Sequence, residues 1–232
     1  MAELCYAVSD QPWRATESKP TMPLHNRVTP LNKIVAYPEH GLFMGNRGCL
    51  HNDHQQIVRQ KCSVKRWIIC LTSFKDRKRS LMAPRQYTEL FFLDEATALA
   101  AGHRPCFECR RRDYRCFKAT WVNGNPESGL TTKSSINKVD AWLHHERLTK
   151  DGQQETYTAV LRDLPSGTFF TIPNCQTPLL IWNGTVLCWT PSGYESVPTI
   201  RDYSEVVVRT PRSTVNSLRA GYIPVVHSTA ED

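Results

Sequence analysis

The stretch "YTELFFLDEATALAAGHRPCFECRRRDYRCF" (residues 87–117) contains most of the signals that decide the fold of this chain. Its first part, "YTELFFL" (87–93), combines aromatic and apolar residues in the way that a buried strand does. Asp94 can cap a helix over "EATALAAG" (95–102), and Gly102 is a typical helix terminator. The stretch therefore predicts a strand that leads directly into a short capped helix.

The neighbouring segments extend this mixed region in both directions. "GLFMGNRGCLH" (41–51) indicates a short strand that enters a turn, and "KRWIICLTSF" (65–74) indicates a buried strand. A second helix is expected from about Pro105 to Trp121. Residues 1–40 contain five prolines and little periodicity, which predicts an extended arm. Together these segments predict a compact region over residues 41–122.

The remainder of the chain changes character after the turn-rich "NGNPESG" (123–129), which is the expected domain boundary. A helix is expected over 136–148, followed by a mostly β region and a terminal helix. The β signals are a strand–turn–strand pattern (156–172), a hairpin with Asn183-Gly184 at its turn (178–190), and a strand (204–210). The sequence thus predicts an α+β protein with a helix plus a β-rich C-terminal domain over residues 130–232.

Composition limits the classes of function. No apolar run approaches the roughly 18 residues of a membrane span, so we expect no membrane partner. The first 20 residues lack a basic segment followed by an apolar one, which predicts a cytoplasmic protein. In that compartment, the nine cysteines are not expected to form a disulfide framework.

The net charge of +7 is concentrated in one region. Residues 59–118 contain 15 Lys or Arg against 6 Asp or Glu, so the rest of the chain is slightly acidic. Concentrated positive charge suits a polyanion, of which nucleic acid is the commonest. The alternative is a basic surface that only keeps the protein soluble.

Cys106 and Cys109 have the two-residue spacing with which two thiolates chelate one tetrahedral zinc ion. A redox pair is the alternative, but a helix and a proline precede this motif instead of the usual βαβ context. A zinc site needs two further ligands. The candidates from the residues alone are Cys49, His51, His54, Cys62 and Cys70.

The segment "YTELFFLDEATALAAGHRPCFECRR" (87–111) resembles the end of the Ada-type zinc-binding segment, which occurs in DNA-repair proteins and in the tails of bacterial nucleases. "GNRGCLH" (45–51) resembles an upstream part of the nuclease-associated versions. The resemblance covers roughly residues 44–112 and implies Zn²⁺, with His51 as one ligand. The order of these two motifs and of the late "AGYIPVVH" (220–227) also resembles a bacterial protein family that implies no activity.

Two departures from the Ada-type pattern matter. Gln55 stands where the family has its second ligand, so we expect Cys70 to supply it, with Cys62 second and His54 third. The ligands expected from the resemblance are therefore His51, Cys70, Cys106 and Cys109. Because His51 replaces the cysteine that accepts a methyl group in the family, methyl transfer does not carry over unless Cys70 substitutes for it. Four protein ligands also predict a structural site.

The basic residues are expected to contact phosphates. Arg111 and Arg115 lie one helical turn apart and share a face. "SFKDRKRSLMAPR" (73–85) is expected to form a basic hairpin tip between two strands. The nucleic-acid contacts predicted in total are Arg47, Lys78, Arg79, Arg104, Arg110, Arg111 and Arg115. The alternative is that these arginines pair with Glu108 and Asp113 on a solvated helix.

Catalytic signals are few. The best group lies on the helix over 136–148, where Asp140 and His144 share a face and Glu146 lies beside them. The alternative is an exposed charged helix face. The favoured function is a zinc-stabilised nucleic-acid-binding protein, with DNA as the expected partner and repair or defence as the process. The alternatives are a metal-dependent or His/carboxylate hydrolase or nuclease, and a structural interaction protein.

Overall fold

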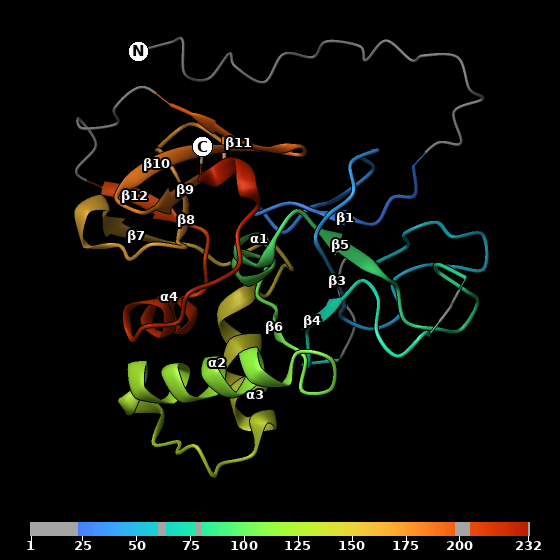
Figure 1. Ribbon diagram of the computed structural model, residues 1–232, viewed down its shortest axis with the longest axis horizontal. Helices are drawn as coiled ribbons and strands as arrows, with labels where there is room; N and C mark the ends of the chain where they lie inside the picture. Colours follow the sequence, from blue (N-terminus) through green and yellow to red (C-terminus); the bar gives the residue numbers. More distant parts are fainter. Residues whose placement is uncertain (1–22, 60–63, 78–79, 198–204, 232) are drawn as a thin grey trace.

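The computed structural model describes residues 23–59, 64–77, 80–197 and 205–231. Two six-stranded sheets and four α-helices make up this part of the chain (Figure 1). The first sheet comes from the chain before Cys106, and the second comes from the chain after Thr156. The predicted α+β class, with a mixed first part and a mostly β second part that ends in a helix, is confirmed.

The first sheet has the strand order β2-β1-β5-β3-β4-β6. Its strands are β1 (Arg27–Val28), β2 (Ile34–Val35), β3 (Phe43–Asn46), β4 (Ile68–Leu71), β5 (Leu90–Phe92) and β6 (Arg104–Pro105). Strands β1 and β2 come from the segment expected to be an extended arm. Residues 23–40 therefore belong to the folded body, while residues 1–22 lie outside the described part of the chain.

The order of the first sheet also corrects the predicted hairpin tip over 73–85. Strand β3 lies between β4 and β5 and pairs antiparallel with both of them. Strands β4 and β5 therefore run parallel on either side of β3, so the segment that joins them does not close a two-stranded hairpin. Lys78 and Arg79 of this segment lie outside the described residues.

The first helix forms as the sequence predicts. Asp94 caps α1 (Glu95–Ala100) by accepting a hydrogen bond of 2.8 Å from the Thr97 amide. Gly102 ends the segment with φ +80°, a conformation that favours glycine. The second helix, α2 (Arg111–Gly124), begins later than the expected Pro105 because Pro105 belongs to β6 and the Cys106–Cys109 segment forms a turn.

Strand β6 pairs parallel with β4, whereas the second sheet is antiparallel throughout, in the order β11-β10-β9-β8-β12-β7. Its strands are β7 (Tyr157–Val160), β8 (Phe169–Thr171), β9 (Leu179–Trp182), β10 (Thr185–Thr190), β11 (Gly193–Ser196) and β12 (Glu205–Val208). The hairpin at Asn183-Gly184 is confirmed, and both residues have positive φ. The strand–turn–strand pattern expected over 156–172 is confirmed as β7, a turn at 166–167 and β8, although the two strands do not pair with each other, because β12 lies between them and pairs with both.

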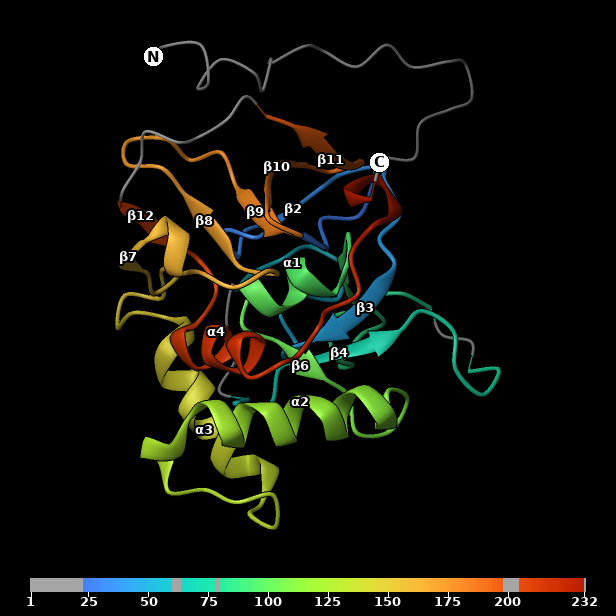
Figure 2. The same cartoon turned by 60° about the vertical axis from the view of Figure 1, so that its left-hand side comes forward.

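The remaining two helices contribute residues to the hydrophobic cores. They are α3 (Ile136–Arg147), close to the expected range, and α4 (Arg212–Arg219). Helix α4 lies between α2 and the second sheet (Figure 2). Its Leu218 packs in the core of the first sheet, whereas its Val215 packs in the core of the second. No helix of the described residues is long and apolar enough to cross a membrane.

The hydrophobic core crosses the boundary expected at 123–129. Phe117 and Trp121 of α2 pack with Val139 and Leu143 of α3 in one cluster with the first sheet. A second cluster joins α1 to the strands of the other sheet; it includes Leu93, Ala96, Ala100, Phe169, Leu180 and Trp189. The segments on either side of the expected boundary therefore share two cores.

Candidate metal centre

Three cysteines meet at one end of the first sheet. Cys70 lies in β4, and the parallel β6 runs beside it with Pro105 opposite Ile69. The Cys106 amide donates a hydrogen bond of 2.9 Å to the Ile69 carbonyl, which fixes Cys106 beside Cys70. The turn that follows returns the chain, so that Cys109 lies near Cys106. At the end of this turn, the Arg110 amide donates a hydrogen bond of 3.2 Å to the Cys106 carbonyl. The Sγ atoms of Cys70, Cys106 and Cys109 all lie within 4.8 Å of one another.

This arrangement favours thiolate chemistry at Cys106. Its Sγ accepts a hydrogen bond of 3.4 Å from the Glu108 amide. The pKa of the Cys106 thiol is lowered well below its ordinary value, first because Cys109 and Cys70 donate hydrogen bonds to its sulfur and then because backbone amides do so. Because thiolates are the form that binds metal, the group can hold a metal ion that prefers sulfur ligands.

A cavity of about 340 Å³ adjoins the three cysteines. Cys70, Cys106 and Cys109 form part of its wall, and Phe74, Phe91, Tyr87, Glu89 and Arg66 are among its other lining residues. Glu89 is buried, and its Oε2 accepts a hydrogen bond of 2.8 Å from the Met82 amide. The three-cysteine group therefore faces a space in which another molecule can approach it.

His51 does not belong to this group, although the resemblance implied it as a ligand. Its Nδ1 lies 2.7 Å from Thr88 Oγ1, and its Nε2 lies 3.2 Å from the Ala83 carbonyl oxygen. Because both ring nitrogens have protein partners elsewhere, the structure corrects this prediction. His54 is exposed and also lies outside the group, whereas Cys62 lies outside the described residues.

Three of the predicted phosphate-binding arginines are buried instead of exposed, which corrects the prediction for them. Arg104 pairs with Asp140, and Arg110 pairs with Glu95 at 2.9 Å and with Asp113 at 2.8 Å. Arg47 is 1% exposed and donates a hydrogen bond of 2.6 Å to Asn32 Oδ1. These guanidinium groups stabilise the interior and cannot contact a phosphate at the surface.

The other two described arginines of the prediction, Arg111 and Arg115, are exposed on α2. The Arg111 guanidinium lies 5.0 Å from the centre of the Phe107 ring. Phe107 stands between the two cysteines of the turn and is 53% exposed. This exposed aromatic–arginine pair was missed from the sequence, although a phenylalanine inside a Cys-x-x-Cys turn with an arginine four residues later could have indicated it.

Two members of the predicted catalytic group of α3 have partners in other elements. The Asp140 carboxylate is buried and accepts hydrogen bonds from Nε and Nη2 of Arg104 in β6. Glu146 accepts hydrogen bonds from Trp142 Nε1 at 3.0 Å and from the Ser213 amide at 3.0 Å. The two carboxylates therefore hold α3 against its neighbours, which corrects their predicted role as acid–base groups.

No protein-family model, no curated protein and no solved structure matches this chain. The Ada-type resemblance thus stays a prediction from the sequence.

Proposed function

We propose that the protein binds zinc through Cys70, Cys106 and Cys109 and uses the surface beside this centre to bind single-stranded DNA. Zinc binding is supported by one observation: three Sγ atoms from two separate chain segments lie within 4.8 Å of one another. Cysteine thiolates at two-residue spacing are typical zinc ligands, and a group of three excludes cations that prefer oxygen. The metal would fix the turn before α2 to the end of β4.

The surface beside the cysteines supports the nucleic-acid part of the proposal. Phe107 presents an exposed ring with Arg111 above it, and Arg115 lies one turn further along α2. A second aromatic residue, Phe74, has the cations of Lys75 and Arg77 near its ring at 5.2 and 5.6 Å. Aromatic rings that alternate with cations are how proteins bind unpaired bases and the phosphates between them. We therefore favour a single strand over a duplex, and repair or defence as its biological setting.

The test is a binding titration of the zinc-loaded protein with fluorescently labelled oligothymidine at several salt concentrations. Phe107→Ala should weaken binding by about 1–3 kcal/mol, because it removes one stacking surface. Arg111→Gln should lower the slope of log affinity against log salt by about 0.7, because it removes one phosphate contact. Zinc content is measured for each variant, so that a lost metal is not mistaken for a lost contact.

Two matched substitutions serve as controls. Ile223 is an exposed apolar residue far along the chain, and Arg162 is an exposed arginine beside the second sheet. Ile223→Ala and Arg162→Gln should leave both affinity and salt slope unchanged. If Phe107→Ala and Arg111→Gln bind as these controls do, the surface beside the cysteines is not the binding site and the DNA proposal fails.

A metal-dependent hydrolase is the second candidate, and the cavity of about 340 Å³ beside the cysteines favours it. Zinc enzymes keep one coordination position for water or substrate, whereas structural sites use four protein ligands. Glu89 is buried in the cavity wall, and its carboxylate would act as the general base in such an enzyme. If the zinc-loaded protein cleaves an oligonucleotide and Glu89→Gln stops cleavage while zinc is kept, this candidate replaces simple binding.

A further inference from the structure

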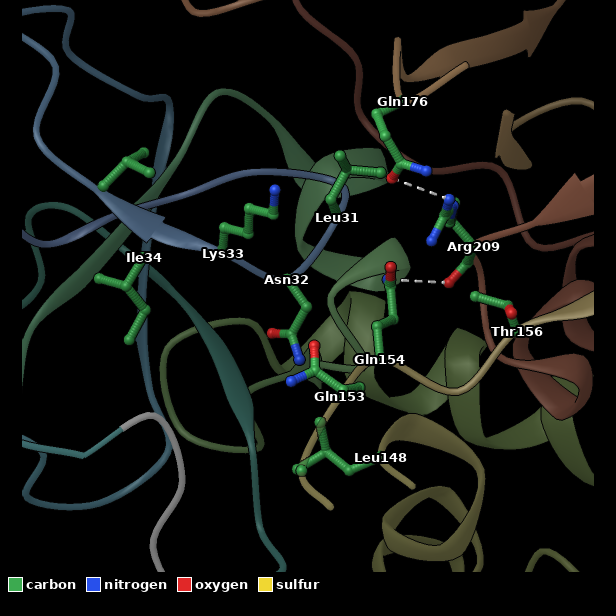
Figure 3. Close-up of a pocket in the computed structure, with 12 residues that line it drawn as sticks. Leu31, Asn32, Lys33, Ile34, Leu148, Gln153, Gln154, Thr156, Gln176 and Arg209 are labelled. Atoms are coloured by element: carbon green, nitrogen blue, oxygen red, sulfur yellow. Dashed lines mark hydrogen bonds between the residues drawn. The ribbon is translucent and has the colours of Figure 1, made fainter. Parts of the chain in front are cut away.

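A second cavity, of about 440 Å³, lies where the two sheets meet and involves none of the three cysteines (Figure 3). Its wall combines the loop before β2, the segment after α3, and residues next to β8 and β12. The amide and cationic side chains of this wall are those of Asn32, Lys33, Gln153, Gln154, Gln176 and Arg209. The volume falls within the range of pockets that hold small organic ligands.

The wall of this cavity is held in place by Gln154. Its Nε2 lies within hydrogen-bonding distance of three carbonyl oxygens, those of Pro30 at 2.9 Å, Ala100 at 3.2 Å and Arg209 at 3.1 Å. These carbonyls come from the first sheet, from α1 and from the end of β12, so one amide ties three parts of the fold together. Gln154 Oε1 is buried and has no hydrogen-bond partner among the described residues. Because three parts of the fold are tied together in this way, the cavity is formed before a ligand arrives.

The charges around the cavity favour an anion. Lys33 and Arg209 line it, and its lining contains no acidic residue. Arg209 donates hydrogen bonds to Thr171 Oγ1 at 3.0 Å and to Gln176 Oε1 at 3.2 Å, which fix its side chain (Figure 3). Among the described residues, Arg209 forms no ion pair, so its charge remains available to a ligand.

Two buried guanidinium groups behind the wall add to this positive potential. Arg47 donates to the Oδ1 of Asn32, and both Arg47 and Arg147 lie 4.5 Å from the centre of the Trp67 ring. Neither arginine forms an ion pair within the described part of the chain. Burial lowers the pKa of each to about 9, so both stay charged at neutral pH. A buried charge without a counter-ion is costly, and a bound anion nearby would reduce that cost.

We propose that this cavity binds a nucleoside monophosphate. Its phosphate would lie against Lys33 and Arg209, and its base against the amides of Asn32 and Gln153. Asparagine and glutamine side chains present a donor beside an acceptor, which matches the hydrogen-bonding edge of a base. Leu31 and Leu148 supply apolar surface in the same cavity for the faces of the base. This site shares no lining residue with the cavity beside the three cysteines, so the nucleotide proposal does not depend on the DNA-binding proposal.

The test is calorimetric titration of the full-length protein with adenosine and guanosine monophosphates, with the matching nucleosides, and with inorganic phosphate. Either nucleotide should bind at least tenfold more tightly than its nucleoside and than phosphate, because only the nucleotide satisfies both halves of the cavity. Lys33→Gln should weaken nucleotide binding about tenfold by removing a charged contact, without affecting the nucleoside. Gln153→Ala should weaken nucleotide and nucleoside alike.

Lys33 and Gln153 are exposed, and no hydrogen bond of either side chain is present among the described residues, so these variants should fold normally. Lys133→Gln and Gln86→Ala are matched controls at exposed positions outside the cavity lining. Equal affinity for nucleotide and nucleoside would overturn the role of the cations. Equal affinity for nucleotide and phosphate would overturn the role of the amides. No binding at millimolar nucleotide, or equal effects of target and control variants, would overturn the site.

Discussion

Arg104 and Asp140 form a buried bidentate ion pair, with Nε 2.8 Å from Oδ1 and Nη2 2.7 Å from Oδ2. Both side chains are nearly inaccessible, at 2% and 3% exposure. Arg104 lies in β6, two residues before the first cysteine of the turn, whereas Asp140 lies in α3. The pair therefore links the strand that positions the candidate metal centre to a helix beyond the expected domain boundary.

Asp140→Asn should lower the free energy of unfolding by about 3 kcal/mol, because it leaves the Arg104 charge buried without its counter-ion. Urea denaturation measures the effect, with exposed Asp151→Asn as the control. Replacing both partners by apolar residues, as Arg104→Met with Asp140→Leu, should restore much of the loss. If the double variant is as unstable as Asp140→Asn, the unpaired charge is not the cause.

Metal analysis of cysteine variants checks the zinc centre. Cys70→Ser, Cys106→Ser and Cys109→Ser should each lose zinc, since each removes one of three neighbouring thiolates. Exposed Cys116→Ser, on α2, should keep one zinc per chain. His51→Ala should also keep zinc, although it removes the contacts with Thr88 and Ala83. Loss of zinc in Cys62→Ser would identify the fourth ligand, and full zinc in Cys106→Ser would refute the centre.

The stability of the protein should depend on pH through His103. This ring is fully buried near Trp67 and Phe92, and desolvation, followed by the charges of Arg47 and Arg147, lowers its pKa well below 6.5. The folded protein keeps it neutral, whereas the unfolded chain binds a proton near pH 6.5. Its contribution to stability is therefore complete above pH 6.5 and is lost as the pH falls below that value.

We expect this residue to reduce the free energy of unfolding by up to about 1.4 kcal/mol for each pH unit below 6.5. Urea denaturation at pH 7.5, 6.0, 5.5 and 5.0 measures the slope. His103→Gln has no titrating ring, so its stability should fall less steeply over the same range. Parallel curves for the two proteins would show that another group controls the acid sensitivity.

The features that the sequence predicted well are those encoded within a few residues. The Asp94 cap needs only the Thr97 amide three residues later, and the turn at Asn183-Gly184 needs only two residues with positive φ. The position of Cys70 near the end of an apolar strand favours it as a ligand. The parallel pairing of β4 with β6 is what brings it to Cys106.

The features that the sequence missed depend on contacts between distant segments. Nothing in the sequence near Arg104 indicates that it will form a buried ion pair with Asp140. Its place beside a cluster of basic residues instead favours a position at the surface. The position of β12 between β7 and β8 likewise depends on pairing across more than 30 residues. The amide-lined cavity is formed by four segments that are far apart along the chain, and none of them carries a recognisable motif alone.

The last prediction follows from the shared cores: the two sheets should unfold together. Tyr194 of β11 donates a hydrogen bond of 2.6 Å to Asp94, the cap of α1, and Trp189 of β10 donates one of 3.2 Å to Thr97. Phe169 and Leu180 pack against α1 in the same cluster. Opening the first sheet would therefore expose apolar surface and buried polar groups of the second, which joins them into one cooperative unit.

Hydrogen exchange on the zinc-loaded protein measures this directly. The slowest amides of β3 and β4 and those of β9 and β10 should exchange with the same opening free energy, since both sets require global unfolding. Removing zinc with a chelator should lower protection in both sheets by the same amount, because the metal stabilises the whole unit. If β9 and β10 keep their protection while β3 and β4 lose theirs, the second sheet is an independent domain after all, as the turn-rich segment 123–129 suggests.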